Sequence, residues 1–360
     1  MERVVALVKS ILGRFSGLMS DDIGIDLGTA NTLVYVNGKG IVINEPSMVA
    51  VNQKTGQVVA IGSDAKNMLG RTPAHVVAVQ PLVDGVISDF EVTEEMLGYL
   101  IRKAQGEKTR LFGPRVVIGV PSGITSVEVR AVQDAARDAS AREVFIVEEP
   151  MAAAIGIRLP VRTPSGSMII DIGGGTTDIG VISLGGLVNA KNVRIAGDKL
   201  NEDIINYVRA EFKILIGKKS AEELKIRAAS VREGDIPLEG TIRGRDLVTG
   251  LPREVVITEA DIREAIGSSV DRLIDAVKEV LETTPPEILS DVMRRGIYLA
   301  GGGALIRGLG ELLGESLGIP VYVADDPLTA VVRGTGMILE DIDLYRELLI
   351  TQSHEFSPTE

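Results

Sequence analysis

The chain has 360 residues, 45% of them hydrophobic, so it is long enough for about two domains with sizeable cores. Its formal net charge of −12 and the lack of a long Lys/Arg run argue against nucleic acid as a partner. The absence of cysteine excludes disulfides and Cys-ligated metals and suits a reducing cytoplasm, while the two histidines disfavour His-rich metal sites and catalytic triads.

Aromatic residues make up only 3% of the chain, so its core must be built from Val, Ile, Leu and Ala, as in sheets flanked by helices. Apolar residues alternate with small or acidic ones from Ile23 to Gly28 as in a strand, and Asn37-Gly38 is a strong hairpin turn signal. The further elements expected in this half are strands over 33–36, 41–43, 48–52, 57–61, 116–120 and 144–147, and helices over 93–104, 127–139 and 151–157.

The segment Pro160–Ser167 has no apolar periodicity and marks the crossing between two halves. The second half restarts with a strand, a Gly/Thr turn and a return strand. Its expected elements are strands over 168–172, 179–184, 297–300 and 321–323, helices over 198–216, 259–281, 305–317 and 328–340, and a mixed polar insertion over 218–257. The polar tail after Ile350 is expected to be disordered.

This restart is an internal repeat. The segment Asp26–Thr32 (DLGTANT) aligns with Asp171–Thr177 (DIGGGTT), and in each a turn of small residues follows an apolar strand that ends in Asp. Two similar α/β domains that face each other would place these two turns across a cleft. The sequence therefore predicts an α/β fold of two similar domains.

Glycine and threonine in such turns suit the binding of phosphate. Without Cβ atoms the backbone approaches a phosphate closely, and its N–H groups form an anion-binding nest to which Thr hydroxyls add donors. Two matched turns lie at Gly28–Asn31 and Gly173–Thr176, and a third glycine-rich turn lies at 301–303. A lone Gly/Thr turn also serves simple hairpins, but the set of three favours a phosphate-bearing ligand.

Asp26 and Asp171 end buried strands, where an unpaired carboxylate is costly. A magnesium ion would compensate for that cost, because it is typically held by one or two carboxylates together with waters and substrate phosphates. The alternative is that each Asp only caps its own turn. The recurrence of the pair favours the metal role.

Four segments resemble motifs of the superfamily of actin, heat-shock chaperones and sugar kinases. Asp26–Thr32 resembles its first phosphate loop, Asp171–Asp178 (DIGGGTTD) its second, and Ala300–Gly308 (AGGGALIRG) its adenosine motif. Val147–Gly156 (VEEPMAAAIG) resembles the connecting segment that carries the water-positioning residue. Two stretches, DIGIDLGTANTLVYV and EEPMAAAIG, look like the MreB family in particular, and the likeness extends over residues 21–345.

The resemblance implies an actin-like ATPase fold, in which two similar α/β domains, each with a small subdomain insertion, surround a nucleotide cleft. It implies ATP or ADP and Mg²⁺ as cofactors, with Asp26 and Asp171 holding the metal through its waters; the preference between ATP and GTP stays open. The residues implied in nucleotide binding are Gly28, Thr29, Ala30, Asn31, Gly173, Gly174, Gly175, Thr176, Gly197, Asp198, Glu222, Lys225, Gly301, Gly302, Gly303 and Ala304. Since Glu222 and Lys225 share a helix face, a surface ion pair is an alternative for them.

The resemblance also assigns the catalytic groups of an ATPase. Glu149 matches the family's catalytic glutamate, and Thr176 its partner across the cleft. A carboxylate at the mouth of a strand can orient water for in-line attack on a phosphate. Glu148 is the adjacent alternative, because strand alternation lets only one of the two face the cleft.

Chain length separates three members of the superfamily. A sugar kinase would need a further substrate pocket, and a chaperone a peptide-binding domain that nothing after residue 350 could build. The resemblance therefore implies a bacterial cytoskeletal protein that organises cell shape and cell-wall synthesis with membrane proteins, and whose slow ATP hydrolysis regulates its filaments. It implies head-to-tail filaments in antiparallel pairs. Val127 matches a lateral contact in that family, and the alternative is that it is ordinary core.

The N-terminus has apolar residues at helical spacing, with Arg3, Lys9 and Arg14 between them. A signal peptide would have an unbroken apolar stretch, which Lys9 and Arg14 interrupt here, and no apolar run reaches the roughly 18–20 residues of a membrane span. An amphipathic helix on anionic lipids at the cytoplasmic face is expected, and packing on the protein or on a partner is the alternative. The residues implied to face lipid are Val4, Leu7, Val8, Ile11, Leu12, Phe15 and Leu18, joined by Leu111 and Phe112, which match the family's membrane-insertion loop.

These patterns together predict the domain boundaries. The segment 1–20 is the amphipathic membrane-binding helix, and 351–360 is the disordered tail. The remaining ranges are 21–157 with 335–350 for the first domain, 52–83 for its small subdomain, 158–334 for the second domain and 199–257 for its small subdomain.

Overall fold

The computed structural model describes residues 21–106, 113–234 and 238–350, which divide into two compact units. The first contains the described residues of 21–120, 124–148 and 331–350, and the second contains 121–123 and 149–330. The chain therefore changes unit after residues 148 and 330, where the sequence predicted 157 and 334. Helix α5 (Glu149–Gly156) belongs to the second unit because it packs on that unit's sheet.

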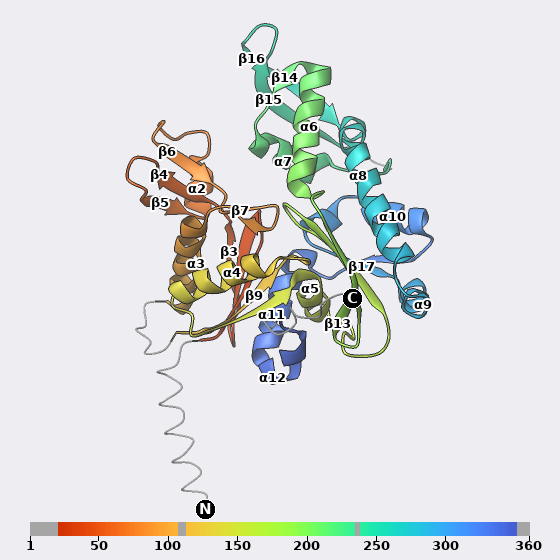
Figure 1. The fold of residues 1–360 in the computed structure, drawn as a ribbon. Helices are drawn as coiled ribbons and strands as arrows, with labels where there is room; N and C mark the ends of the chain where they lie inside the picture. Colours follow the sequence, from red (N-terminus) through yellow and green to blue (C-terminus); the bar gives the residue numbers. More distant parts are fainter. Residues whose placement is uncertain (1–20, 107–112, 235–237, 351–360) are drawn as a thin grey trace, which may run out of the picture. The chain divides into compact units, whose positions relative to one another are not determined.

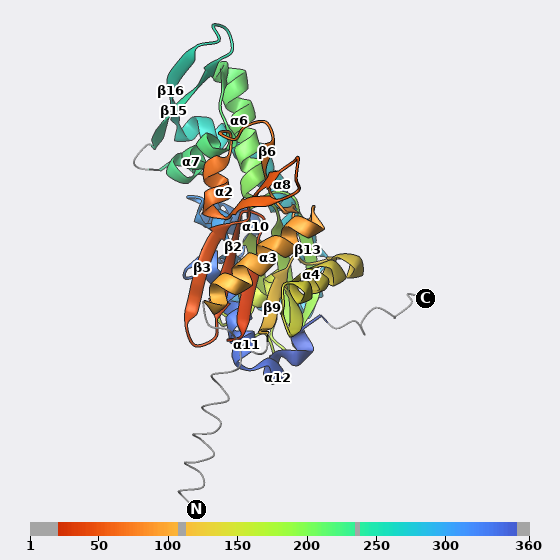
Figure 2. The same ribbon diagram turned by 90° about the vertical axis from the view of Figure 1, so that its left-hand side faces the viewer.

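The first unit is built on a five-stranded mixed sheet in the order β3-β2-β1-β9-β10 (Figure 1). The first three strands form an antiparallel meander, and the last two join β1 in parallel. Helices α3 and α4 lie side by side over the sheet (Figures 1 and 2). The bounds are β1 (Ile23–Leu27), β2 (Asn31–Val36), β3 (Gly40–Pro46), β9 (Arg115–Val120), β10 (Glu143–Glu148), α3 (Phe90–Gln105), α4 (Ser126–Asp138) and α11 (Ala330–Glu340).

The two faces of β1 show why this unit packs as it does. Ile23 and Ile25 are fully buried in a core that they share with apolar side chains of α3 and α4. Successive residues of a strand point to opposite faces, so Gly24 faces the other way, toward α11. A Cβ atom at Gly24 would lie 2.5 Å from Thr335 Oγ1, and this glycine therefore lets α11 pack closely.

The second unit is built on a sheet with the order β13-β12-β11-β17-β18. Here too the first three strands in sequence are antiparallel, and the last two join β11 in parallel. The bounds are β11 (Ser167–Ile172), β12 (Thr177–Ser183), β13 (Gly186–Val193), β17 (Ile297–Ala300), β18 (Val321–Val323), α6 (Gly197–Phe212), α8 (Glu259–Glu282), α9 (Pro286–Arg295) and α10 (Leu309–Leu317).

The shared strand order and register confirm the internal repeat. Asp26 pairs with Leu33 on β2, and Asp171 pairs with Asp178 on β12. On the other side, Asp26 pairs with Gly119 of β9, and Asp171 occupies the same place beside β17. The two aspartates thus lie one residue before the ends of equivalent strands, at the same register position of equivalent sheets.

Each unit also carries a small three-stranded sheet. In the first unit its strands are β5-β4-β6 with a short helix, and in the second they are β14-β15-β16 with helix α7 beside them. The bounds are β4 (Val49–Asn52), β5 (Val58–Ile61), β6 (Val76–Val79), α2 (Ser63–Met68), β14 (Ile214–Leu215), β15 (Glu239–Asp246), β16 (Pro252–Thr258) and α7 (Lys218–Ala228).

Three expected helices begin or end elsewhere. The helix expected over 198–216 ends at Phe212, because Lys213 adopts a left-handed conformation with φ 56° and a short strand follows. Gly308, with φ 77°, separates a 3₁₀ turn at Gly302–Leu305 from α10, where a single helix was expected over 305–317. A 3₁₀ turn likewise precedes α11, which starts at Ala330. The sequence pattern did not indicate β13 or α9.

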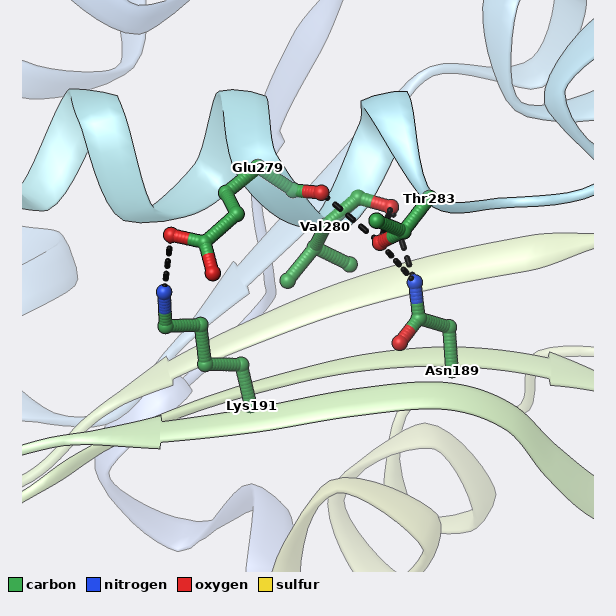
Figure 3. A network of polar contacts seen from close by, with 5 residues as sticks. All are labelled: Asn189, Lys191, Glu279, Val280 and Thr283. Carbon is green, nitrogen blue, oxygen red and sulfur yellow. Dashed lines mark hydrogen bonds and ion pairs between the residues drawn. The ribbon is translucent and has the colours of Figure 1, made fainter.

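Strand β13 matters because it fixes α8 to the sheet (Figure 3). Lys191 forms an ion pair with Glu279, and Asn189 Nδ2 donates to the Val280 carbonyl at 2.9 Å and to Thr283 Oγ1 at 2.8 Å. Asn189 and Lys191 are two apart on the strand and therefore face the same helix.

Among the described residues, no helix combines the length and the apolar character needed to cross a membrane.

Two helical glycines should respond in opposite ways to the same substitution. Gly267 in α8 has open space around a would-be Cβ, so Gly267→Ala should stabilise the fold by about 0.5–1 kcal/mol. Gly336 in α11 lies against the Tyr35 ring, 2.8 Å from a would-be Cβ, so Gly336→Ala should destabilise by about 1–3 kcal/mol. Urea unfolding of the nucleotide-free protein measures both changes. Equal effects of the two substitutions would contradict the packing of α11 on β2.

Candidate nucleotide site

The turn after β11 is held by hydrogen bonds that engage three of its carbonyl groups. Gly173 N–H donates to the Thr176 carbonyl at 2.9 Å, which closes the turn. The first two amides of α6 then donate to the same turn: Gly197 N–H to the Gly173 carbonyl at 3.1 Å, and Asp198 N–H to the Gly174 carbonyl at 2.8 Å. With its carbonyls engaged inside the unit, the turn presents a ligand with amide donors, as an anion-binding nest requires.

The third glycine-rich turn lies directly on the end of β11. Gly301 has φ 77°, which favours glycine, and a Cβ atom there would overlap the Ile172 carbonyl oxygen and Asp171 Oδ1. A Cβ atom at Gly303 would overlap the Ile172 side chain. Only glycine permits this approach, so the predicted adenosine motif and the second phosphate loop share one locality within the second unit.

Residues predicted to contact the ribose and base lie beside the same turn. Lys225 of α7 is half-buried, and its Nζ donates to the Gly197 carbonyl at 2.8 Å. Burial lowers the pKa of Lys225, and the charges of Glu222 and Asp198 oppose that shift. Burial raises the pKa of Asp198, which Lys218 and Lys225 partly offset. Lys225 is thus part of a half-buried polar cluster with Glu222 and Asp198, and the alternative of an ion pair with Glu222 stays open.

The first unit engages the carbonyls of its own turn by another means. Ser47, which follows β3, donates its hydroxyl to the Gly28 carbonyl at 2.5 Å and its amide to the Ala30 carbonyl at 3.1 Å. The Thr29 hydroxyl accepts from Gly85 N–H at 3.2 Å. A Cβ at Gly28 would lie 2.7 Å from the Asn31 carbonyl oxygen. The sequence motif did not indicate Ser47, because it lies outside the turn that it supports.

The two aspartates are desolvated carboxylates, as their strand ends predicted. Asp171 is 7% exposed, and burial raises the pKa of Asp26 to about 7. A carboxylate whose charge is disfavoured by burial gains from a nearby cation, and oxygen donors are what Mg²⁺ prefers. The donor chemistry of each aspartate therefore fits the predicted magnesium role.

The two candidate catalytic glutamates lie where β10 ends and α5 begins. Glu148 is the last residue of β10, and Glu149 is the first residue of α5. Strand alternation therefore does not decide between them, since the strand ends at Glu148. Glu149 belongs to the second unit together with Thr176, which is 6% exposed.

Asp178 ends the DIGGGTTD motif and is held by hydrogen bonds that the motif did not indicate. It is 1% exposed, and its Oδ1 accepts from Ser122 N–H at 2.7 Å and from Ser122 Oγ at 2.6 Å. Its Oδ2 accepts from Asn192 Nδ2 at 2.8 Å. Burial raises the pKa of Asp178, and these hydrogen bonds lower it.

Two remaining predictions concern surfaces. Val127 lies in the first turn of α4 and is 77% exposed, so the alternative that it is ordinary core is wrong for this chain. The helix start itself is well formed, with a capping box between Thr125 and Glu128. The predicted membrane residues of 1–18, together with Leu111 and Phe112, lie outside the described residues.

Comparison with known proteins gives consistent matches over most of the chain. The model of the MreB/Mbl protein family matches residues 20–347. The cell shape-determining protein MreB of Escherichia coli is 50% identical over 339 residues, which cover 93% of this chain and 98% of the relative. The cell shape-determining protein Mbl of Bacillus subtilis is 48% identical over 326 residues, which cover 91% of this chain and 98% of the relative.

Solved structures match in the same way. The crystal structure of MreB5 of Spiroplasma citri bound to ADP has a TM-score of 0.86 and 38% identity, covering 92% of this chain and 98% of that one. The same protein bound to AMPPNP matches at 39% identity with the same TM-score, over 91% of this chain and 98% of that one. The MamK double helical filament has a TM-score of 0.76 at 24% identity, over 89% of this chain and 98% of that one, and it bears on the fold alone.

The contact between Gly301 and Asp171 predicts a selective loss of ligand affinity. Gly301→Ala should displace the Asp171 carboxylate and weaken the binding of Mg-ADP about 10- to 100-fold, the effect of losing hydrogen bonds to a charged group. Gly318→Ala is a matched control, because Gly318 also has positive φ (66°) but no atom near a would-be Cβ. It should cost about 1–2 kcal/mol of stability and no affinity. Calorimetry with Mg-ADP that finds equal affinities for the two variants would contradict the role of the third turn.

Proposed function

Because the chain belongs to the MreB/Mbl family of cell shape-determining proteins, we propose that it is a filament-forming cytoskeletal ATPase that assembles on the cytoplasmic membrane and organises cell-wall synthesis. The observation that carries the proposal is the pair of carbonyl-engaged turns, each behind an aspartate at the same register position. The relative bound to ADP and to AMPPNP supports adenine nucleotide as the ligand.

In this proposal each unit supplies one phosphate turn and one carboxylate to the same nucleotide. The backbones of Gly28–Asn31 and Gly173–Thr176 would cradle the β- and γ-phosphates, and Gly301–Ala304 would approach the α-phosphate and adenosine. Gly197, Asp198, Glu222 and Lys225 would bind the ribose and base. Asp26 and Asp171 would hold Mg²⁺ through its waters, and the ion would neutralise charge on the phosphates.

Hydrolysis in this proposal depends on an oriented water molecule. Glu149 would accept a hydrogen bond from that water, and Thr176 would form a second hydrogen bond with the same water. The water oxygen forms a bond to the γ-phosphorus while the bond from that phosphorus to the bridging oxygen breaks. The products are ADP and inorganic phosphate, and one proton is released to solvent. A water molecule that is positioned but is not deprotonated by a strong base attacks slowly, so this arrangement is consistent with slow turnover.

Changing Glu149 tests the hydrolytic role. Glu149→Ala should keep Mg-ATP binding but slow phosphate release about ten- to a thousand-fold, the loss of one positioning group. Glu148→Ala is the matched control, since the two residues are adjacent and both half-buried. Calorimetry and a phosphate-release assay separate binding from turnover. If Glu148→Ala lowers turnover and Glu149→Ala does not, the role belongs to Glu148.

Self-assembly in antiparallel protofilament pairs is proposed from the same family membership, with Val127 at the lateral contact. Val127→Glu should leave the fold intact, because the side chain is 77% exposed on a capped helix. It should place like charges at the contact and give single protofilaments or none. Ile226→Glu is the control, since Ile226 is also 76% exposed but lies on α7 of the second unit. Electron microscopy with Mg-ATP that finds normal pairs in Val127→Glu would exclude this contact.

Membrane association is proposed through residues 1–18 and the pair Leu111 and Phe112. The three cations of the N-terminal segment would each contribute about 1 kcal/mol near anionic lipid, and each fully inserted apolar residue of the pair about 1.5–3 kcal/mol. One copy would bind weakly and a filament strongly. Co-sedimentation with anionic liposomes should fall when residues 1–18 are removed and Leu111 and Phe112 are changed to Ser. Unaltered sedimentation of that variant would refute the membrane role, and packing on the protein would take its place.

A further inference from the structure

Ser47 is a buried serine in the short connection between β3 and β4 of the first unit. Its hydroxyl donates to the Gly28 carbonyl at 2.5 Å, and its amide donates to the Ala30 carbonyl at 3.1 Å. Ser47 is 1% exposed, so both donors are shielded from bulk solvent. One residue outside the turn that follows β1 therefore supplies the donors for two carbonyl groups of that turn.

The direction of each hydrogen bond at the Ser47 hydroxyl follows from its chemistry. Thr32 Oγ1 lies 2.8 Å from Ser47 Oγ, and Thr32 is also 1% exposed. A hydroxyl has one hydrogen to donate, and a carbonyl oxygen only accepts. The hydrogen of Ser47 is therefore committed to Gly28, and Thr32 must be the donor to Ser47. The hydroxyl of Ser47 is thus held from both sides, which fixes it toward the Gly28 carbonyl.

The internal repeat shows that this side chain takes the place of a backbone donor. Gly28 of the first turn aligns with Gly173 of the second. The Gly173 carbonyl accepts the amide of Gly197 at the start of α6, and the Gly28 carbonyl accepts the Ser47 hydroxyl instead. In both units the donor comes from the segment that follows the third strand of the sheet. The first turn therefore depends on one side chain where the second depends on a helix backbone.

Loss of the Ser47 hydroxyl would leave the Gly28 carbonyl without its donor. A peptide group is planar and rotates as one unit, and glycine at position 28 permits backbone angles that other residues avoid. Half a turn of the peptide between Gly28 and Thr29 would put the carbonyl oxygen where the Thr29 amide points. A carbonyl oxygen repels a phosphate that an amide would attract.

We propose that Ser47 is a positioning residue for nucleotide binding, which keeps the Gly28 and Ala30 carbonyls turned away from the phosphates so that the amides of the first turn face them. The inference rests on the proposed nucleotide binding and adds to it the side chain that orients the first turn. Ser47 does not touch the ligand in this scheme, and it acts through the backbone of the turn. Its removal should therefore weaken binding without removing a group that takes part in hydrolysis.

Calorimetry of the full chain with Mg-ADP and with Mg-AMPPNP measures the affinity, and phosphate release from Mg-ATP gives kcat and KM. Ser47→Ala should weaken the binding of both nucleotides about 10- to 100-fold, the effect of leaving one carbonyl without its donor. KM should rise by a similar factor, because slow chemistry makes KM a measure of binding. The kcat should change less than about three-fold, since Glu149 and Thr176 belong to the second unit.

Two further variants separate positioning from folding. Ser183→Ala is the matched control, because Ser183 is also a buried serine whose hydroxyl donates to a backbone carbonyl, that of Pro164 at 2.9 Å. Ser183 ends β12, at the opposite end of that strand from the second turn, so its change should leave affinity and KM unaltered. Should Ser47→Ala fail to fold, Ser47→Cys leaves a weak donor in place and should weaken both nucleotides about three- to ten-fold.

The outcomes distinguish this inference from the function on which it rests. If the unaltered chain binds neither nucleotide, the proposed nucleotide binding and the inference fall together. If it binds both and Ser47→Ala binds them within two-fold as tightly, nucleotide binding stands and the inference is overturned. A loss of affinity in Ser183→Ala equal to that in Ser47→Ala would show a general effect on folding and reject the positioning role. A lower kcat in Ser47→Ala at unchanged KM and affinity would also overturn it.

Discussion

The approach of the Gly301 turn to the end of β11 is the contact on which the arrangement of the second unit's site depends. Strands β11 and β17 are parallel neighbours, so the loops that follow them leave the sheet at the same edge. Residues with Cβ atoms at 301 or 303 would keep those loops apart, because they would meet Ile172 or the Asp171 carboxylate. With glycine there, the predicted adenosine motif, the predicted phosphate turn and Asp171 lie close together.

The two units use different donors to engage the carbonyl groups of their equivalent turns. A turn that is to bind anions must turn its carbonyls away from the ligand, and those carbonyls need donors elsewhere. In the first unit Ser47 supplies a hydroxyl and an amide from the end of β3. In the second unit the first two amides of α6 do so, and they are donors that a helix start always leaves without a partner inside the helix. Shared topology therefore does not imply shared supporting residues.

The sequence predicted those features that depend on local pattern. The apolar runs 116–120 and 144–147 form strands as predicted. The two Asp-x-Gly turns predicted correctly that the two sheets are equivalent. The local pattern did not predict the end of α6, because a single backbone angle sets it. Lys213 adopts a left-handed conformation, which ends the helix before the apolar residues that follow. It also failed for supporting contacts between distant residues. Ser122 and Asp178 are 56 positions apart, and no spacing rule connects them.

The difference between Leu33 and Asp178 shows where the repeat has diverged in chemistry. An apolar residue at this position needs only burial, and it adds nothing to the turn that precedes it. A carboxylate there must be desolvated, and it recovers the cost only by fixing several donors at once. Each side chain so fixed loses rotational freedom, and here these side chains are Ser122 and Asn192. The supports of the first turn act on backbone carbonyls and on the Thr29 hydroxyl as an acceptor. In the second unit the Asp178 carboxylate instead ties β12 to β13 and to the segment Pro121–Gly123, so the repeat keeps its topology while different contacts hold the strand that follows each turn.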